Sequence, residues 1–403
     1  MKLDLDRSAF YLTCGALLSI LFSIAVSQIL LAVALAAVLF SSTKIRLPPI
    51  KLPLALFIAG TAISLLASGH IAEGMPQIRK FYVFFILLVA YSTFRQTAEI
   101  RTIVLLWTGI ATLSALRSFF QFWRIYQQSQ AQHVSFYDFY VGSRITGFMS
   151  HWMTFGGEEM IVLLLLAAYL FFSGERRWKR VGWLCAVILA CSMVLGFTRS
   201  IFLLGFPIGL LYLLWFWKKW LVAAVPAVVL IAFFLGPHAL RERIISVVDP
   251  HGAVDSNQHR AILRETGLLI IRAHPWLGIG PEQVKYQSDR WIPASALPLP
   301  VGYYGHLHNV YLQYAAERGV PTLLIFLWMI AKILWDFARA LRQKSATPEA
   351  RFVLQGAIAV ILALLAEGYA EYNFGDSEVL TMFLAVVAFG YIAVGRDTAE
   401  SAA

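Results

Sequence analysis

His308 is the residue in this sequence whose type and setting best suit general-base chemistry. It directly precedes Asn309, a residue type that favours helix N-termini, so we expect His308 to lie at the start of a helix. The partial positive charge at that end disfavours imidazolium and keeps the ring neutral. A neutral imidazole can accept a proton, as a general base must. The alternative is an interfacial histidine whose ring only hydrogen-bonds to a loop carbonyl.

The helix that begins at Asn309 is predicted to be short. Arg318 suits its last turn, Gly319 suits the position just beyond it, and Pro321 suits the first turn of a following helix. The segment 305–322 is also too polar for the deep part of a membrane span. We therefore expect about ten residues of helix, roughly 15 Å long, at the non-cytoplasmic membrane interface.

Other ionisable residues near this segment are interpreted as structural. His306 is two residues from His308 and should face elsewhere on any regular backbone. A zinc site of His306, His308 and His274 is not expected, because no glutamate or cysteine stands at ligand spacing beside them. Glu367 and Glu371, one helical turn apart, are interpreted as boundary residues rather than as a proton path. We expect no metal and no cofactor.

A second pattern is a preference for arginine over lysine on one side of the predicted membrane. On the predicted topology, that side holds twelve arginines and two lysines. The planar guanidinium binds phosphate oxygens bidentately, whereas lysine is a point charge, so the bias suits an enzyme that handles a lipid-linked phosphate or pyrophosphate. The alternative for each arginine is snorkelling or pairing with nearby acids. The arginines are Arg79, Arg117, Arg124, Arg144, Arg199, Arg241, Arg243, Arg260, Arg264, Arg272, Arg290 and Arg318.

Four of these arginines have better settings than the rest. Arg199 lies in a link too short to do more than turn the chain between two spans, and a charge held at the membrane boundary without a local partner is a functional candidate. Arg144 lies in Gly-Ser-Arg-Ile-Thr-Gly, just before a span. Arg260 and Arg264 are four residues apart, so a helix would present them on one face.

Membrane helices must position these residues. Hydrophobic residues make up 59% of the 403 positions, charged residues 14%, and the mean hydropathy is +0.69. Such a chain lacks the polar surface of a soluble protein of its length, so lipid must be its solvent, and nucleic acid is not an expected partner. Apolar runs of about 20 residues predict an all-α polytopic protein with about twelve spans, two of them in a hairpin of residues 9–41 that turns near Ser27 and Gln28. The alternative for residues 9–41 is one long tilted span, which would change the side of the N-terminus only. The other predicted spans are 53–68, 80–94, 102–122, 152–172, 181–197, 201–217, 220–236, 320–338, 352–370 and 377–395.

Loop composition predicts how the spans are oriented. Short loops rich in lysine and arginine are predicted to be cytoplasmic, together with both termini. The other side carries the two long stretches 123–151 and 237–305. We expect nine spans in 1–236, a large, partly helical outer loop with the catalytic helix in 237–319, and three spans plus a cytoplasmic tail in 320–403. The basic loop residues include Lys44, Arg46, Arg176, Arg177, Lys218, Lys219, Arg339 and Arg342.

The segment around His308 resembles a motif of the O-antigen ligase family of the bacterial inner membrane. The family pattern His-[Asn/Ser/Gln]-x9-Gly-x2-[Gly/Thr/Tyr] is met by His308, Asn309, Gly319 and Thr322. The match lies in the large late loop and directly before a span, as it does in the family. The resemblance covers most of the chain in layout, because the family also has many spans and one large periplasmic loop.

Two further elements extend this resemblance. Arg199 and Leu203 meet an Arg-x3-Leu pattern. Arg260, followed by a helical stretch into the segment 274–280, resembles the arginine and HPxxGxG passage of the wider ligase and polymerase superfamily. Arg264 stands where that superfamily often has an aromatic residue, so Arg264 either replaces a packing residue or adds a phosphate contact.

The resemblance implies an inverting, metal-independent glycosyltransferase of the bacterial inner membrane. Such enzymes move O-antigen polysaccharide from undecaprenyl-pyrophosphate to a sugar hydroxyl of lipid A–core on the periplasmic side, among membrane lipids. His308 would be the general base, and Arg199 and Arg260 would clamp the pyrophosphate. The residues expected to contribute to substrate binding are Arg144, Arg264, Asn309 and Arg318.

Two alternatives remain at the level of the sequence. An O-antigen polymerase, or another lipid-linked glycan transferase of the same superfamily, would share the arginines and differ in its acceptor, and the histidine pattern favours the ligase. A polysaccharide or lipid transporter would have ionisable residues deep in the membrane and repeated halves, and the predicted spans are poor in both.

Overall fold

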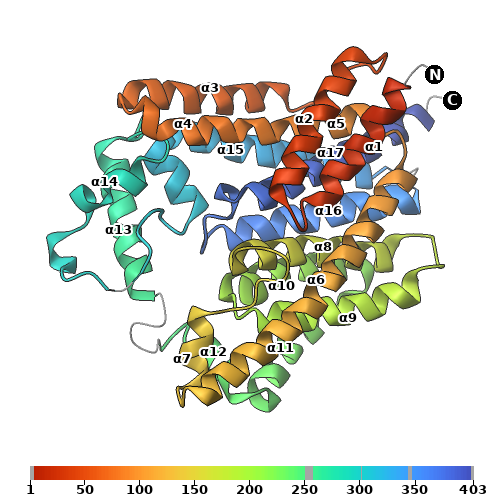
Figure 1. The fold of residues 1–403 in the computed structure, drawn as a ribbon. Coiled ribbons are helices and arrows are strands. Elements are labelled where there is room, and N and C mark those ends of the chain that lie inside the picture. The colour runs from red at the N-terminus through yellow and green to blue at the C-terminus, as the bar shows by residue number, and fades with distance from the viewer. Residues whose placement is uncertain (1–3, 250–256, 301, 344–346, 401–403) are drawn as a thin grey trace.

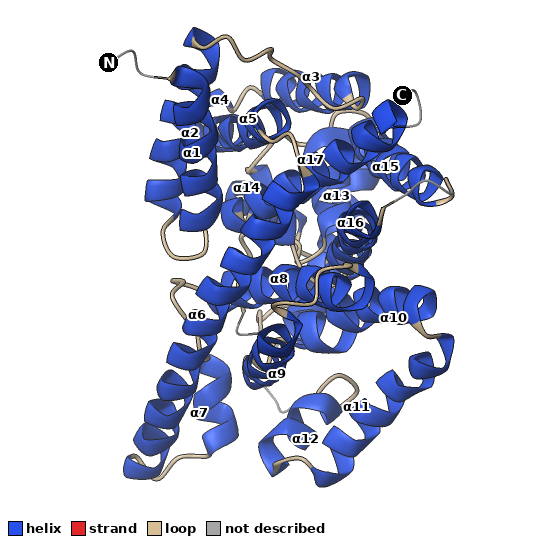
Figure 2. Ribbon diagram, turned by 90° about the vertical axis from the view of Figure 1, so that its right-hand side faces the viewer, coloured by secondary structure: helices blue, strands red, loops and turns tan. Residues whose placement is uncertain are grey.

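The computed structural model describes residues 4–249, 257–300, 302–343 and 347–400. Every regular element within these ranges is helical (Figure 2), which confirms the predicted all-α fold. Helices satisfy their own backbone hydrogen bonds, as a lipid environment requires. Parts of the predicted outer loop (250–256 and 301) and both chain ends lie outside the described residues. The α-helices are α1 (Leu5–Ser19), α2 (Ile24–Phe40), α3 (Lys51–Ser68), α4 (Ile71–Arg79), α5 (Phe85–Thr93), α6 (Thr97–Ala131), α7 (Phe136–Gly142), α8 (Trp152–Phe172), α9 (Lys179–Leu195), α10 (Phe206–Trp217), α11 (Ala224–Leu235), α12 (His238–Ile245), α13 (Asn257–Ala273), α14 (Gln283–Trp291), α15 (Val310–Leu341), α16 (Pro348–Glu367) and α17 (Ser377–Glu400).

Seven helical segments among the described residues are long and apolar enough to cross a membrane. The predicted count of twelve spans is therefore not confirmed. The other five predicted spans fall on α1, α2, α5, α9 and α11, each shorter than 18 residues. The seven segments are Lys51–Ser68, Thr97–Ala131, Trp152–Phe172, Ser200–Trp217, Val310–Leu341, Pro348–Glu367 and Ser377–Gly395.

The first two helices form the predicted hairpin, but its turn comes earlier than expected. α1 ends at Ser19 and α2 begins at Ile24. The Ser23 hydroxyl caps α2 by accepting from the backbone N–H of Val26. Ser27, at the predicted turn, is instead a buried helical residue whose hydroxyl donates to the Ala16 carbonyl of α1 at 2.8 Å.

The centre of the bundle is formed by α8, α16 and α17. α16 packs against α8, α10 and α17, and small residues allow this close approach. A Cβ at Gly209 of α10 would lie 2.9 Å from the Ala359 carbonyl, and one at Gly356 of α16 would lie 3.0 Å from Leu165. These tight contacts hold α10 close to α16, and α16 close to α8.

The helices of the predicted outer loop lie at one end of the bundle. In Figure 1, α13 and α14 are at the left end, and the start of α1 and the end of α17 are at the right. That the large loop and the termini lie on opposite sides of a membrane stays a prediction. The periplasmic side of the large loop stays a prediction from loop charge.

Candidate active site

The start of α15 lies where the sequence predicts it. The Asn309 side-chain oxygen accepts from the Leu312 N–H at 2.9 Å, and the Asn309 amide donates to the Tyr369 carbonyl at 2.8 Å. The Val310 N–H donates to the Gly368 carbonyl at 2.8 Å. The cap therefore stabilises the helix and also anchors it to the segment that follows α16.

The predicted break at Gly319 is also present. α15 is interrupted there, with φ 82° and ψ 158°, a conformation open to glycine. The segment after α13 bonds across this break: the Val320 N–H donates to the Pro275 carbonyl at 2.8 Å, and the Ile279 N–H donates to the Ala316 carbonyl at 2.9 Å. The HPxxGxG passage therefore fastens the end of the short helix that begins after His308.

His308 lies in a strained turn directly before α15. Its φ is 47°, in the left-handed region that residues other than glycine rarely adopt. The turn brings Nδ1 to 2.9 Å from Oε1 of Glu371, and Nε2 to 3.3 Å from the carbonyl oxygen of Tyr303. In the neutral ring, Nδ1–H donates to the carboxylate, which leaves Nε2 as the nitrogen that can accept a proton.

Glu371 links His308 to Arg260. Its Oε2 lies 2.9 Å from Nη2 of Arg260, whose Nη1 donates to the Ala370 carbonyl at 2.8 Å. Burial acts to raise the pKa of Glu371, but the hydrogen bond to His308 and the charges of His308 and Arg260 outweigh it and hold the pKa below its usual range. Glu371 is therefore a carboxylate within the site, and its interpretation as a boundary residue is wrong.

His306 lies beside His308 rather than facing elsewhere. The two ring centroids are 4.1 Å apart, the His308 N–H donates to Nδ1 of His306 at 3.2 Å, and Nε2 of His306 lies 3.9 Å from Oε1 of Glu371. The prediction failed because it assumed a regular backbone, and the positive φ of His308 breaks that assumption. Burial, then the charge of His308, lowers the pKa of His306 to about 4.

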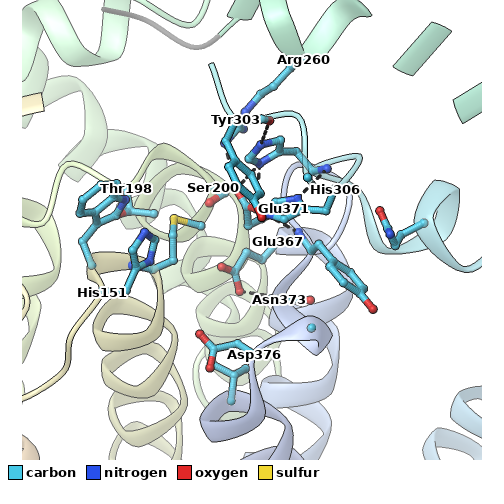
Figure 3. A pocket seen from close by; sticks show the side chains of 18 of the residues that line it. His151, Thr198, Ser200, Arg260, Tyr303, His306, Glu367, Glu371, Asn373 and Asp376 are labelled. Atoms are coloured by element: carbon cyan, nitrogen blue, oxygen red, sulfur yellow. Dashed lines mark hydrogen bonds and ion pairs between the residues drawn. The ribbon is translucent and has the colours of Figure 1, made fainter. Parts of the chain in front are cut away.

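Four arginines line one cavity of about 560 Å³ together with His308 and Glu371. Figure 3 shows Arg260, His306 and Glu371 gathered in this cavity, with Glu367, Asn373 and Asp376 also lining it. Burial, reinforced by the charges of Arg243, Arg260 and Arg199, lowers the pKa of Arg144 to about 9. Because these cations destabilise one another, an anion in the cavity would be stabilised by all of them.

The structure fixes Arg199 with several partners. Nη1 donates to the Ser246 carbonyl at 2.7 Å, and Nη2 donates to Oδ1 of Asn257 at 2.9 Å. Arg243, which the sequence did not single out, donates from Nε to the Phe197 carbonyl at 2.8 Å. Arg243 therefore holds the link before Arg199, and the outer arginine bias was the available signal for it.

A second cavity, also of about 560 Å³, meets the first at the predicted catalytic residues. Both cavities are lined by Arg199, Ser200, Arg260 and His308. The second has a more apolar wall, and Arg264, exposed on α13, lies one turn from Arg260 on it. Its other lining residues include Leu203, Leu204, Ala261, Leu307, Asn309 and Leu312.

Arg318 is the one predicted site residue that lines neither of these cavities. Its side chain is 1% exposed, and its guanidinium lies 4.2 Å from the ring centroid of Tyr314 and 5.2 Å from that of Phe57. A side chain packed in this way cannot reach a substrate in either cavity. Its predicted binding role is therefore not carried further.

His259 is a site residue that sequence reasoning missed, and Glu371 is one that it misinterpreted. His259 precedes Arg260, lines the first cavity, and has a ring centroid 5.3 Å from that of His308. Burial, then the charge of His308, lowers its pKa to about 4. For Glu371, the available signal was an acid at the end of an apolar span with no cation nearby in sequence.

Comparison with known proteins bears on the segment that holds these residues. A family model described as O-antigen ligase matches residues 184–327, which include Arg199, Arg260 and His308. No curated protein sequence matches the chain significantly. The matched segment contains each motif on which the resemblance was based. Over residues 184–327, the chain is therefore similar to the O-antigen ligase family, which supports the resemblance that its motifs indicate.

Proposed function

We propose that this membrane protein transfers O-antigen polysaccharide from undecaprenyl-pyrophosphate to a sugar hydroxyl of lipid A–core at the periplasmic face of the bacterial inner membrane. The observation that carries the proposal is the ion-paired group of His308, Glu371 and Arg260 at the place where two cavities meet. A transferase that joins two large lipid-linked substrates needs a base at such a junction.

Arg199 and Arg260 bind the carrier pyrophosphate in this proposal. Both line the two cavities, and Nε of Arg260 has no hydrogen-bond partner among the described residues. Each guanidinium group can bind two phosphate oxygens at once, and it stabilises the negative charge that develops on the leaving pyrophosphate. With Arg144 and Arg243 close by, the chain itself supplies the positive charge, so transfer needs no divalent metal.

His308 activates the acceptor. Its Nε2 takes the proton of the acceptor hydroxyl as that oxygen attacks the anomeric carbon of the donor sugar. The bond from this carbon to the pyrophosphate oxygen breaks, and its electron pair leaves with the carrier. The imidazolium that forms is stabilised by Glu371 through Nδ1–H, as a carboxylate stabilises the histidine of a catalytic triad. A single displacement of this kind inverts the anomeric configuration.

The two cavities suit different substrate parts. The apolar wall near Leu203, Leu204 and Leu312 suits the polyprenyl chain. Arg264 and Asn309 line the same cavity, where they would contact the phosphates of the bound carrier. The more polar first cavity suits the sugars of the acceptor. Sequential filling of the two cavities would bring the anomeric carbon and the hydroxyl together beside His308.

A deletion strain tests the proposal against the polymerase alternative. Loss of the whole lipopolysaccharide ladder with an intact core, while carrier-linked polymer accumulates, is the expected result. A core that carries a single repeat unit would instead assign a polymerase. Purified protein should then form ladder product from carrier-linked donor and lipid A–core, and failure of this reaction under conditions where the protein is folded would refute the proposal.

A further inference from the structure

His306, His308 and Glu371 form a compact set of donor atoms, and the proposed reaction gives His306 no role. One atom from each residue lies within 4.8 Å of the other two. Oε1 of Glu371 is 2.9 Å from Nδ1 of His308 and 3.9 Å from Nε2 of His306. We propose that these three residues bind Zn²⁺, and that the bound ion switches the transferase off.

The donor set is one that zinc prefers. Two imidazole nitrogens and one carboxylate oxygen make a three-ligand zinc site with a fourth position open. Magnesium and calcium favour oxygen-only sites, so they compete poorly here. The other carboxylate oxygen, Oε2, remains paired with Arg260 at 2.9 Å, which orients Glu371 from outside the ligand set.

Proton positions in the two rings decide the consequence of binding. When Nδ1 of His308 binds the metal, its proton moves to Nε2, which lies 3.3 Å from the Tyr303 carbonyl and can donate to it. When Nε2 of His306 binds, its proton moves to Nδ1, and the bond from the His308 N–H to that atom is lost. No proton is gained or released overall. The nearby arginines oppose the cation, so we expect modest affinity.

Inhibition follows from the proton on Nε2. In the proposed reaction, Nε2 of His308 accepts the acceptor's proton, and an Nε2–H cannot do so. Zinc also occupies the oxygen of Glu371 that stabilises the imidazolium. Inhibition rests on the proposed function, whereas metal binding does not.

Cobalt spectroscopy tests the binding without any assay of transfer. Purified full-length protein in detergent is titrated with Co²⁺, whose visible absorption reports coordination by protein ligands. We expect saturation at one ion per chain, competition by Zn²⁺, and loss of the absorption in His306→Ala. His151→Ala is the matched control, because His151 lines the same cavity but lies outside the ligand set, and it should keep the absorption. No absorption in wild type, or the same absorption in His306→Ala, would overturn the site.

Transfer assays test the inhibition. Zn²⁺ should inhibit wild type and His151→Ala alike, excess EDTA should restore full activity, and Mg²⁺ should have no such effect. His306→Ala should need at least about tenfold more Zn²⁺ for half-inhibition, because one of three ligands is gone. Stimulation by Zn²⁺, or equal inhibition of His306→Ala, would refute inhibition through this site. If no transfer activity is found at all, the proposed function fails, and the cobalt titration still decides the metal site.

Discussion

Replacing Glu371 by glutamine removes one charge from the site with little change in shape. The carboxylate contacts His308 at 2.9 Å and Arg260 at 2.9 Å, so both neighbours lose a charged partner. An amide can still accept from Nδ1 of His308 through its oxygen. If the amide nitrogen faces the ring instead, it donates to Nδ1 and puts the ring proton on Nε2, the tautomer that cannot act as a base.

The size of the effect follows from these two possibilities. A charge-assisted hydrogen bond contributes about 1.5–3 kcal/mol, and its loss in the transition state corresponds to a rate about 10- to 150-fold lower. The wrong tautomer raises the loss to about 10⁴-fold, the magnitude known for the equivalent change in a catalytic triad. We therefore expect Glu371→Gln to lower kcat by between about 10-fold and 10⁴-fold. Donor affinity should fall less, because Arg260 remains in place.

The assay is ladder formation by purified protein from carrier-linked donor and lipid A–core, with thermal unfolding as a check of the fold. Glu367→Gln is the matched control: Glu367 lines the same cavity and is hydrogen-bonded by Asn373, with no contact to His308. The double variant Glu371→Gln with His308→Ala shows whether Glu371 acts on transfer through His308 or independently of it. If Glu371 acts through His308, glutamine adds no further loss in the His308→Ala background. Transfer near the wild-type rate by folded Glu371→Gln, or fully additive losses, would refute the reasoning.

Four further predictions concern the same region. His308→Ala should lower transfer by about 10²–10⁴-fold with normal folding, and near-normal transfer would exclude the base. Arg260→Lys keeps the charge but loses bidentate geometry, so the KM for the carrier-linked donor should rise by about tenfold or more in kinetic assays. An unchanged KM would show that the role of Arg260 is structural. The pKa values of His259 and His306 are lowered to about 4 from the ordinary value of about 6.5, so protonation of these residues favours unfolding. The midpoint of thermal unfolding should therefore fall as the pH is lowered from about 6.5 to about 4. A midpoint that does not change over this range would contradict the lowered pKa values. Gly319→Ala places a methyl group where φ is 82°, so the free energy of unfolding should fall by at least about 1–3 kcal/mol in unfolding experiments. An unchanged free energy would show that the backbone at residue 319 adopts another conformation without cost.

Local features of the fold could be predicted because short-range chemistry decides them. Asn309 caps α15 and Gly319 breaks it, as their residue types indicate. α8 spans Trp152–Phe172 as its largely apolar run predicts, although Glu158 and Glu159 lie within it. The number of spans was less certain, because apolar runs also form short helices such as α9 that pack in the bundle. Hydrophobicity shows that a segment avoids water, and it does not fix the length of its helix.

The composition of the site depended on contacts between distant parts of the chain. Glu371 is 63 residues from His308, and its partnership with that ring arises only when the start of α15 docks on the end of α16. His306 was misplaced because a regular backbone was assumed where His308 has a positive φ. Arg318 was expected to face a substrate, but aromatic rings of α3 and α15 cover it. In each case the deciding interaction is a tertiary contact that the residue's own neighbours in sequence do not specify.

The two sequence motifs are better understood as two sides of one contact. A Cβ at Gly278 would collide with the backbone at Glu317, and one at Gly319 would collide with the Trp276 carbonyl, so each glycine is required by the other motif's main chain. The passage 274–280 therefore does not need to touch a substrate to matter for transfer. It holds the end of the short helix whose start follows His308, while Asn309 holds that start against the end of α16. The short helix that follows His308 is therefore held at both ends. This anchoring positions the imidazole accurately against a bulky lipid-linked sugar at the membrane interface.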